Sequence, residues 1–350
     1  MAALIHEMGR RPTITPFLIH TGQHFSAEMS DVFFRDLSIP QPEVNLGIGG
    51  GSQTQQTAEM MCRLEPVLLE ARPSAVLVVG DVNSTMAAAL VAAKLGIRIA
   101  HVEAGLRSFD RTMPEEINRI VTDALSDYLF VTESSGRKNL LAEGVPEDRI
   151  FFVGNVMIDT LLRFRSRSAE SDVLNRLGLG RKQYAVVTLH RPSNVDAPAQ
   201  LLRLTDALSK LAEHIPVVFP VHPRTLAKIE SAGIAPAKVL LIPPLGYIDF
   251  IRLIGDARLV LTDSGGIQEE TTILQVPCLT LRKNTERPVT VEQGTNRLIG
   301  TEPDAIVSAA LDILGSPAME NAACVPELWD GKASARILDI LEKQLRLPSR

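Results

Sequence analysis

The stretch "AVLVVGDVNSTMAAALVAAKLGIRIAHVEAG" at positions 75–105 decides the class of the fold. Apolar runs at 75–81 and 97–105 flank a helical pattern at 84–96. The runs are short and nearly continuous, which is typical of parallel strands buried on both faces. The stretch therefore predicts a strand, a helix and a second strand of a doubly wound α/β sheet.

The same alternation of strand and helix patterns continues along the chain. Further buried strands are predicted at 15–22, 128–132, 150–154, 184–190, 216–222, 239–244, 258–264 and 276–282, and a further helix at 56–71. A polar, helix-like segment at 160–183 bridges the two groups of strands, which predicts two α/β halves. An amphipathic pattern at 333–347 predicts a last helix that could pack on either half.

Length and composition exclude several classes of protein. A chain of 350 residues with 45% hydrophobic and 22% charged residues is typical of an ordinary globular protein of about two domains. The net charge of −5 without a basic tract argues against duplex nucleic acid as a partner. The cysteines, at 62, 278 and 324, match neither a disulfide framework nor a zinc pattern. Long apolar segments and a signal-peptide layout are missing, so we expect a cytoplasmic protein without membrane contact.

Polar residues gather where the predicted strands end, and ligands of doubly wound sheets bind there. The candidates are Gln23, His24, Asp81, Asn83, Ser84, Thr85, His101, Glu103, Arg107, His190, Arg191, Asn194, His222 and Arg224. Some have structural alternatives, because Ser84 can cap a helix and His101 or His222 can be satisfied core histidines. Glu103 is harder to explain structurally, because it interrupts an apolar run and a buried carboxylate needs a partner or a function.

The segment "MPEEINR" at 113–119 offers further carboxylates. Pro114 can open a helix, and acidic residues in a first helical turn complement the helix dipole, which would explain Glu115 or Glu116 structurally. Glu103 and Glu115, however, flank one loop. Two carboxylates that face a ligand from the two sides of a loop could act as acid and base.

The segment "LVLTDSGGIQEE" at 259–270 predicts an anion site. Its Ser264, Gly265 and Gly266 lie where a strand gives way to a helix that is expected to start near Ile267. Bare backbone N–H groups and the helix dipole suit a phosphate or diphosphate there. Glu269 and Glu270 would fall in the first turn, where one carboxylate can reach ribose hydroxyls, and Arg287 or Arg297 could complete the anion grip. The alternative is a plain tight turn.

Other cofactor motifs are missing. "GIGGGS" at 47–52 is not the dinucleotide fingerprint G-x-G-x-x-G, and neither a P-loop nor H-E-x-x-H is present. The sequence therefore signals neither NAD, ATP nor zinc.

Taken together, the motifs resemble those of the non-hydrolysing UDP-N-acetylglucosamine 2-epimerase family. They are "TGQH", "GD-x-x-S/T", "HVEAGLRS", "PEE-x-NR", "TLHR", "TDSGGIQEE" and "ERP…GT-x-R-L-G", in this order over nearly the whole chain. The resemblance implies a GT-B architecture with two Rossmann-like domains and an active site in the cleft between them. It assigns 1–160 with the C-terminal helix 333–350 to the N-terminal domain and 161–332 to the UDP-binding domain.

The resemblance also implies an isomerase that interconverts UDP-GlcNAc and UDP-ManNAc for polysaccharide biosynthesis, without a cofactor or metal, as a homodimer. It implies that Asp81, Glu103 and Glu115 are the acid/base carboxylates and that His190 supports the diphosphate or proton transfer. The implied UDP-binding residues are His222, Phe250, Ser264, Gly265, Gly266, Glu270 and Arg297, with Phe250 against the uracil. A regulatory UDP-GlcNAc site would use Gln23, His24 and Arg63.

The sequence departs from the family pattern in two places. Family members usually open with a strand and a "GTRPE"-type loop that helps to hold the diphosphate, and this chain starts at the helix that follows. A misassigned start or a truncation would explain this departure, and a real truncation is expected to weaken nucleotide binding and turnover. In "HRPSN", Ser193 replaces a glutamate near the regulatory site.

Three alternatives remain at this stage. One is a GT-B glycosyltransferase, although Pro277 and Cys278 stand where retaining members carry a glutamate eight residues beyond the first. The others are a hydrolysing epimerase that releases ManNAc and UDP, and an inactive nucleotide-sugar-binding protein.

Overall fold

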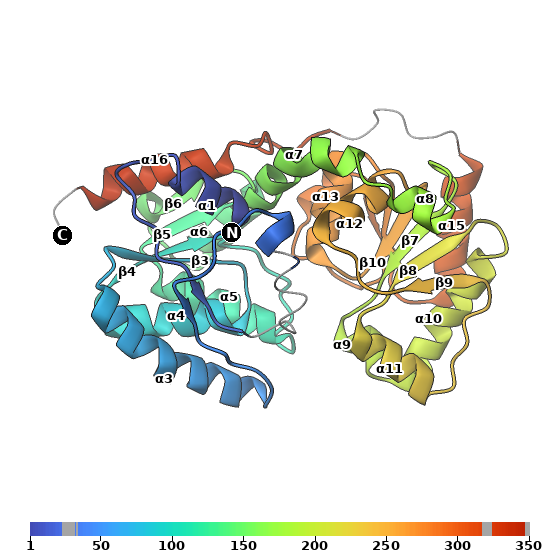
Figure 1. The fold of residues 1–350 in the computed structure, drawn as a ribbon, viewed down its shortest axis with the longest axis horizontal. Coiled ribbons are helices and arrows are strands. Elements are labelled where there is room, and N and C mark those ends of the chain that lie inside the picture. Colours follow the sequence, from blue (N-terminus) through green and yellow to red (C-terminus); the bar gives the residue numbers. More distant parts are fainter. Residues whose placement is uncertain (23–31, 33, 317–323, 347–350) are drawn as a thin grey trace. The chain divides into compact units, whose positions relative to one another are not determined.

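The computed structural model describes residues 1–22, 32, 34–316 and 324–346. Its chain divides into two compact units, Met1–Thr160 with Glu327–Arg350 (unit 1) and Leu161–Pro326 (unit 2). The first boundary falls inside helix α7, Val156–Ala169. Each unit combines helices with a parallel sheet (Figure 1), which confirms the predicted α/β class.

Unit 1 contains a four-stranded sheet of order β3-β4-β5-β6 and a separate pair, β1-β2. The strands are β1 Ile19–His20, β2 Val44–Asn45, β3 Ala75–Val79, β4 Arg98–Val102, β5 Tyr128–Val131 and β6 Ile150–Phe152. The helices are α1 Ala2–Met8, α3 Gln53–Ala71, α4 Asn83–Lys94, α5 Pro114–Leu125, α6 Ser134–Ala142, the first part of α7 and α16 Ala333–Leu345, with a 3-10 turn at Glu147–Arg149.

Helices cover both faces of the unit 1 sheet. On one face, Ala100 and Phe130 of the central strands pack with Leu4 of α1 and Leu338 of α16. On the other face, Val78 and Ile99 pack with the small residues of α4. The amphipathic segment at the C-terminal end therefore completes the core of the first unit, and Arg11 reinforces this contact through ion pairs to α16.

Unit 2 contains a six-stranded parallel sheet of order β12-β11-β10-β7-β8-β9. The strands are β7 Ala185–Thr188, β8 Val217–Pro220, β9 Val239–Ile242, β10 Leu259–Thr262, β11 Cys278–Thr280 and β12 Asn296–Leu298. The helices are the remainder of α7, α8 Val173–Leu177, α9 Pro192–Val195, α10 Pro198–Leu211, α11 Pro223–Ser231, α12 Tyr247–Gly255, α13 Gly265–Leu274, α14 Val289–Glu292 and α15 Pro303–Gly315.

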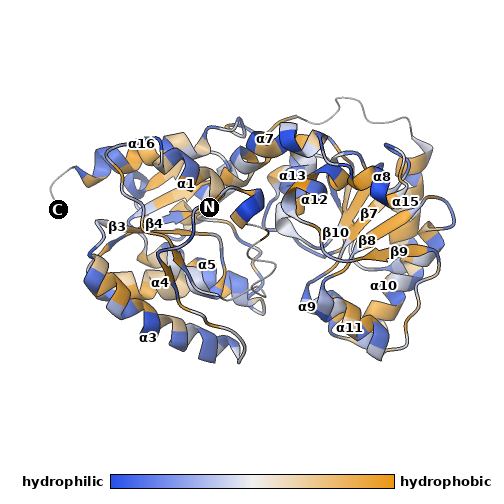
Figure 2. Cartoon of the chain, in the orientation of Figure 1, coloured by the Kyte–Doolittle hydropathy of each residue, from blue (hydrophilic) through white to orange (hydrophobic). Residues whose placement is uncertain are grey.

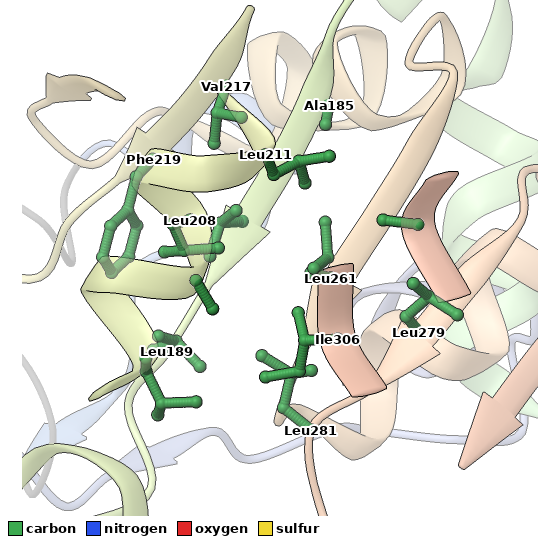
Figure 3. Packing of buried hydrophobic residues seen from close by; sticks show 14 of the residues in the cluster. Ala185, Leu189, Leu208, Leu211, Val217, Phe219, Leu261, Leu279, Leu281 and Ile306 are labelled. Carbon is green, nitrogen blue, oxygen red and sulfur yellow. The ribbon is translucent and has the colours of Figure 1, made fainter. Parts of the chain in front are cut away.

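Alternate residues of the unit 2 strands face two buried layers. Phe219 and Leu261 belong to a cluster with Leu208 of α10 and Ile306 of α15 (Figure 3). Val260, which precedes Leu261 on β10, is outside this cluster and is also completely buried. Strands buried on both faces read as continuous apolar runs, and Figure 2 shows β7, β8 and β9 as hydrophobic along their length. This burial explains why the sequence predicted these strands.

The predicted strands and helices are largely confirmed. Each predicted strand contains an observed one, usually shorter at its ends, although only Ile19–His20 of 15–22 is in a strand. Strands β2 and β12 were not predicted. None of the helices in the described part of the chain is both long and apolar enough to cross a membrane.

Candidate active site

Two side chains of helix α5 hold Asp81 of unit 1 by hydrogen bonds. Its Oδ2 accepts hydrogen bonds from Nε (3.0 Å) and Nη2 (2.7 Å) of Arg119, whose side chain is almost fully buried. The backbone carbonyl of Asp81 accepts a further bond from Asn118 at 2.8 Å. Both donors of the guanidinium converge on one oxygen, so Oδ2 of Asp81 has a defined position near the end of β3, with a quarter of the side chain exposed.

The loop between Glu103 and Glu115 is held by the buried carboxylate of Glu116. Glu116 accepts hydrogen bonds from the N–H of Ser108 (2.9 Å), the hydroxyl of Ser108 (3.0 Å) and the N–H of Phe109 (2.9 Å). It also pairs with Arg119 at 2.5 Å. Of the two adjacent glutamates, Glu116 therefore has the structural role, because its carboxylate holds the loop against the first turn of α5.

Glu103 and Glu115 lie at the two ends of this loop. Glu103 follows β4, is only 8% exposed and has a backbone φ of +71°. A residue with a side chain adopts this left-handed region at a cost in free energy, and such strain gathers at functional sites. Glu115 lies in the first turn of α5, is half-buried and follows Pro114 at the start of the helix.

In unit 2, three neighbouring strand ends carry the predicted binding residues. Strands β10, β7 and β8 are adjacent in the sheet, so Ser264, His190 and His222, which follow them, gather along one edge. His190 is half-exposed, and its Nδ1 lies 2.9 Å from Oδ1 of Asp263. His222 caps α11 by accepting the N–H of Arg224 at Nδ1. Burial, the neighbouring His190 and Arg224 lower the pKa of His222.

Asp263 organises this edge although it is completely buried. It accepts the backbone N–H groups of His190 and Arg191 and the amide of Asn194, at 3.0 to 3.2 Å. Burial opposes its ionisation, but the hydrogen bond and charge of His190 together with these donors hold the pKa of Asp263 below its usual range. The contact with Asp263 fixes the direction of the half-exposed His190 ring at this edge.

Helix α13 begins at Gly265, with Ser264 as its N-cap. A Cβ atom on Gly265 would lie 2.6 Å from Nη1 of Arg287, so glycine is needed for this guanidinium to pack against the start of the helix. Arg287 also pairs with the buried Glu269 and Glu286. The described residues thus bring Arg287 to this helix start, whereas Arg297 is exposed on the edge strand β12, separated from β10 by β11.

The predicted position of the two glutamates in α13 was wrong. The helix starts at Gly265 rather than near Ile267, because both glycines adopt the helical conformation, so Glu269 and Glu270 fall in the second turn. Glu270 is buried and accepts a hydrogen bond from the hydroxyl of Tyr247 at 3.2 Å. Burial raises the pKa of Glu270 to about 7, and the Tyr247 bond opposes this only in part. Phe250 lies half-buried on the same helix as Tyr247.

The residues predicted for a regulatory site are only partly described. Arg63 lies on α3, donates to the carbonyl of Leu46 at 2.5 Å and pairs with Glu59, whereas Gln23 and His24 lie outside the described residues. Within those residues, no group of three or more His, Cys, Asp or Glu side chains is arranged to hold a metal ion.

Sequence reasoning missed the partners that hold the candidate residues. Arg119 was visible at the end of "PEE-x-NR", four residues after Glu115, and Asp263 stands directly before Ser264. Their spacing from Asp81 and His190 in the sequence gave no signal of the pairing. Tyr247 precedes the predicted Phe250 by less than one helical turn on α12.

The chain matches known proteins over nearly its whole length. The family model for UDP-N-acetylglucosamine 2-epimerase matches residues 6–342. A UDP-N-acetylglucosamine 2-epimerase from Methanocaldococcus jannaschii is 42% identical over 335 residues, which cover 93% of this chain and 90% of the relative. A UDP-2,3-diacetamido-2,3-dideoxy-D-glucuronate 2-epimerase from Pseudomonas aeruginosa is 43% identical over 336 residues, covering 95% of this chain and 92% of the relative.

Solved structures agree with the fold. The M. jannaschii UDP-GlcNAc 2-epimerase in complex with UDP-GlcNAc and UDP is similar with a TM-score of 0.90 at 40% identity, covering 98% of this chain and 95% of that one. The Neisseria meningitidis UDP-GlcNAc 2-epimerase bound to UDP-GlcNAc has a TM-score of 0.90 at 31% identity, with 98% and 96% covered. These similarities confirm the expected GT-B class of the α/β fold. The chain therefore belongs to the UDP-N-acetylglucosamine 2-epimerase family, a family of isomerases.

Proposed function

We propose that this chain reversibly converts UDP-N-acetylglucosamine to UDP-N-acetylmannosamine without hydrolysing it. The observation that carries the proposal is the placement of Asp81, Glu103 and Glu115 at the carboxyl ends of the adjacent strands β3 and β4 and at the start of α5. The names of the relatives, and the UDP-GlcNAc bound in two of the similar structures, support it.

The chemistry explains why several carboxylates are needed. The proton on C2 of the sugar is not acidic, because C2 carries no carbonyl group. In an anti elimination, a base takes that proton, its bonding electrons form the C1=C2 double bond, and the C1–O bond breaks to release UDP. The product is 2-acetamidoglucal. Return of UDP to C1, with a proton delivered to the opposite face of C2, completes the epimerisation.

Unit 1 supplies the groups that we propose for proton transfer. Asp81, Glu103 and Glu115 are the acid/base carboxylates, and Arg119 and Glu116 hold them in place. The support for this assignment is geometric: Asp81 is fixed by two donors of Arg119, and the loop between Glu103 and Glu115 is fixed by Glu116. A positioned carboxylate transfers a proton more effectively than a mobile one, because less reorganisation is needed.

Unit 2 supplies the groups that we propose for holding UDP. The diphosphate lies at the start of α13 against Ser264, Gly265 and Gly266, where N–H groups and the helix dipole favour an anion. His190, oriented by Asp263, and His222 face the same ligand from the neighbouring strand ends. Glu270 accepts the ribose hydroxyls and Phe250 packs against the uracil. Arg297 completes the set on the basis of its motif.

The remaining assignments rest on the family pattern. We propose that the enzyme works in the cytoplasm as a homodimer and feeds polysaccharide biosynthesis. Arg63, with Gln23 and His24, is the proposed contact of a second, regulatory UDP-GlcNAc. Sedimentation of the purified chain at several concentrations tests the dimer, and a single species of monomer mass would contradict it.

A second substrate is favoured by one comparison. The P. aeruginosa relative that is named for UDP-2,3-diacetamido-2,3-dideoxy-D-glucuronate is as similar to this chain as the relatives named for UDP-GlcNAc. Both sugars carry UDP at C1 and an acetamido group at C2, so the same elimination applies. Parallel assays with the two UDP-sugars decide between them through the ratio of kcat/KM.

Incubation with UDP-GlcNAc in D₂O tests the proposed reaction. Deuterium at C2 of the recovered UDP-GlcNAc and UDP-ManNAc is the expected result. Free ManNAc would instead indicate a hydrolysing epimerase, and UDP binding without any exchange would indicate an inactive nucleotide-sugar-binding protein.

Two variants test the site. Glu103→Gln and Glu115→Gln are expected to fold and to lose exchange at C2, whereas Glu70→Gln, on the exposed side of α3, is the matched control and should keep full activity. Near-normal turnover in both site variants would refute the assignment.

A further inference from the structure

His101 occupies the interior of unit 1 with both ring nitrogens bonded. It lies on β4, is completely buried, and its Nδ1 is 2.6 Å from Oδ1 of Asp123. Its Nε2 is 2.9 Å from the backbone carbonyl of Gly80. A carbonyl oxygen can only accept, so Nε2 must carry a proton.

The second ring nitrogen must carry a proton as well. Asp123 Oδ2 accepts from the N–H of Gly105 at 3.1 Å and from Arg107 at 2.7 Å, which is the bonding pattern of an ionised carboxylate. Its other oxygen, Oδ1, therefore accepts a hydrogen bond from a protonated Nδ1 of His101. With donors on both sides, the imidazole is a buried cation.

The balance of charges around the ring supports this protonation state. Burial opposes the charge on His101, but the Asp123 carboxylate, the Gly80 carbonyl and the more distant Glu103 raise the pKa of His101. Burial likewise opposes ionisation of Asp123, but His101 and Arg107 hold the pKa of Asp123 below its usual range. Asp123, Glu103 and Arg107 are the charged groups that the described contacts place around the imidazole. Arg107 is in turn paired with Glu143.

The pair joins the segments that carry the proposed acid/base carboxylates. Gly80, which receives the Nε2 bond, directly precedes Asp81. Gly105, which donates to Asp123, follows Glu103 by two residues. Asp123 itself lies on α5, the helix whose first turn carries Glu115. The buried pair of His101 and Asp123 therefore links the segments that follow β3 and β4 to helix α5.

The segment that it holds is under local constraint. Glu103 has a φ of +71° and Gly105 a φ of +76°, and a Cβ at Gly105 would lie 2.4 Å from the carbonyl oxygen of Gly136. A backbone in this region needs surrounding contacts to keep it there. The bond from the Gly105 N–H to Asp123 is such a contact.

We propose that His101 and Asp123 form a positioning pair for the epimerisation, in which a buried imidazolium–carboxylate contact fixes the backbone on either side of Asp81 and Glu103. The proposal rests on the proposed function of those carboxylates. Neither member touches the reacting atoms. Their effect is on the geometry of proton transfer, so losing the pair lowers kcat more than it raises KM.

The wild-type protein tests the protonation state without any substitution. In ¹⁵N-histidine-labelled protein, the His101 ring should show two protonated nitrogens at about pH 8, where an ordinary imidazole with a pKa of about 6.5 is neutral. The signal is assigned by its loss in His101→Asn. A neutral ring at that pH would overturn the proposal, whatever the enzyme's activity.

Kinetics of Asp123→Asn test the positioning role. We expect kcat to fall by up to about 100-fold, because a displaced proton-transferring group reacts poorly, with KM for UDP-GlcNAc and the affinity for UDP changed less than about twofold. The matched control is Asp159→Asn, another buried carboxylate of unit 1, which accepts the N–H groups of Ala333 and Ser334 at the start of α16. It should lower the unfolding temperature and leave kcat unchanged.

The outcomes separate the two proposals. An Asp123→Asn protein that loses only stability and keeps kcat would reduce the pair to a structural one and refute the positioning role. A wild-type protein without C2 exchange would instead refute the proposed function, and with it the role of the pair, while its NMR signal would still report the buried cation.

Discussion

The buried carboxyl of Glu270 makes the stability of unit 2 depend on pH. Burial raises its pKa from 4.5 to about 7 in the folded chain, whereas the unfolded chain keeps the ordinary value. Because the folded pKa is the higher one, the stability that this group contributes is fully present below about pH 4.5 and is lost as the pH rises through about 7. The difference between the two pKa values corresponds to about 3 kcal/mol.

Replacement of Glu270 by Gln removes this titration and keeps the shape of the side chain. Relative to the wild type, Glu270→Gln should therefore gain up to about 3 kcal/mol in free energy of unfolding between about pH 4 and about pH 8. Urea unfolding followed by circular dichroism measures the difference at each pH. Trp329, the single tryptophan of the chain, lies in unit 1 and cannot report on unit 2. Hydrogen exchange of the α13 amides is therefore used to assign the transition to unit 2.

The matched control is Glu230→Gln on α11, which removes an exposed carboxylate of the same unit. Its stability should follow that of the wild type within about 0.5 kcal/mol at every pH. A constant difference between Glu270→Gln and the wild type across the pH range would refute the reasoning, as would a variant whose stability relative to the wild type falls as the pH rises.

Three further predictions concern other parts of the molecule. If the Glu270 carboxylate accepts ribose hydroxyls, UDP binding at about pH 7 should release up to about half a proton, which calorimetry in two buffers detects; no release would contradict that contact. Glu103→Gly should be more stable than Glu103→Ala by about 1 kcal/mol, because only glycine tolerates the φ of +71° without strain, and equal denaturation midpoints would argue against strain. Leu338→Ala should destabilise unit 1 by about 2–5 kcal/mol by leaving a cavity, as measured by Trp329 fluorescence during unfolding. The control Leu69→Ala, on the exposed side of α3, should cost less than about 0.5 kcal/mol. Similar losses of stability in the two variants would refute the packing role of Leu338.

The fold could be predicted where burial leaves a clear pattern. Strands such as β10 are buried on both faces, so their apolar runs stand out between amphipathic helices. The strands β2 and β12 end in exposed residues, so they lack the continuous apolar run that identifies the equally short but fully buried β11. The start of α13 was misplaced because Gly265 and Gly266 were assigned to the junction before the helix, whereas they are its first two residues.

The sequence was sufficient to propose candidate residues but not to predict their contacts. Strand-end positions identified Asp81, Glu103 and His190 because the topology of a parallel sheet brings such ends together. The partners are set by tertiary structure: Arg119 lies 38 residues from Asp81, and Asp263 lies 73 residues from His190. Sequence spacing contains no information on such pairs, and the choice between Glu115 and Glu116 depended on which one turned inward.

The discontinuity of unit 1 has a consequence for synthesis of the chain. Its cluster around Leu4, Ala100 and Phe130 is covered by Leu338 and its neighbours on α16, and Trp329 donates to the carbonyl of Thr132 at 2.9 Å. These covering residues are translated only after all of unit 2, a delay of roughly 10 to 30 s at ordinary rates of elongation. The nascent protein thus carries an uncovered apolar face on a ribosome-bound chain whose second unit is already complete. Unit 1, whose synthesis begins first, is therefore the last to complete its core.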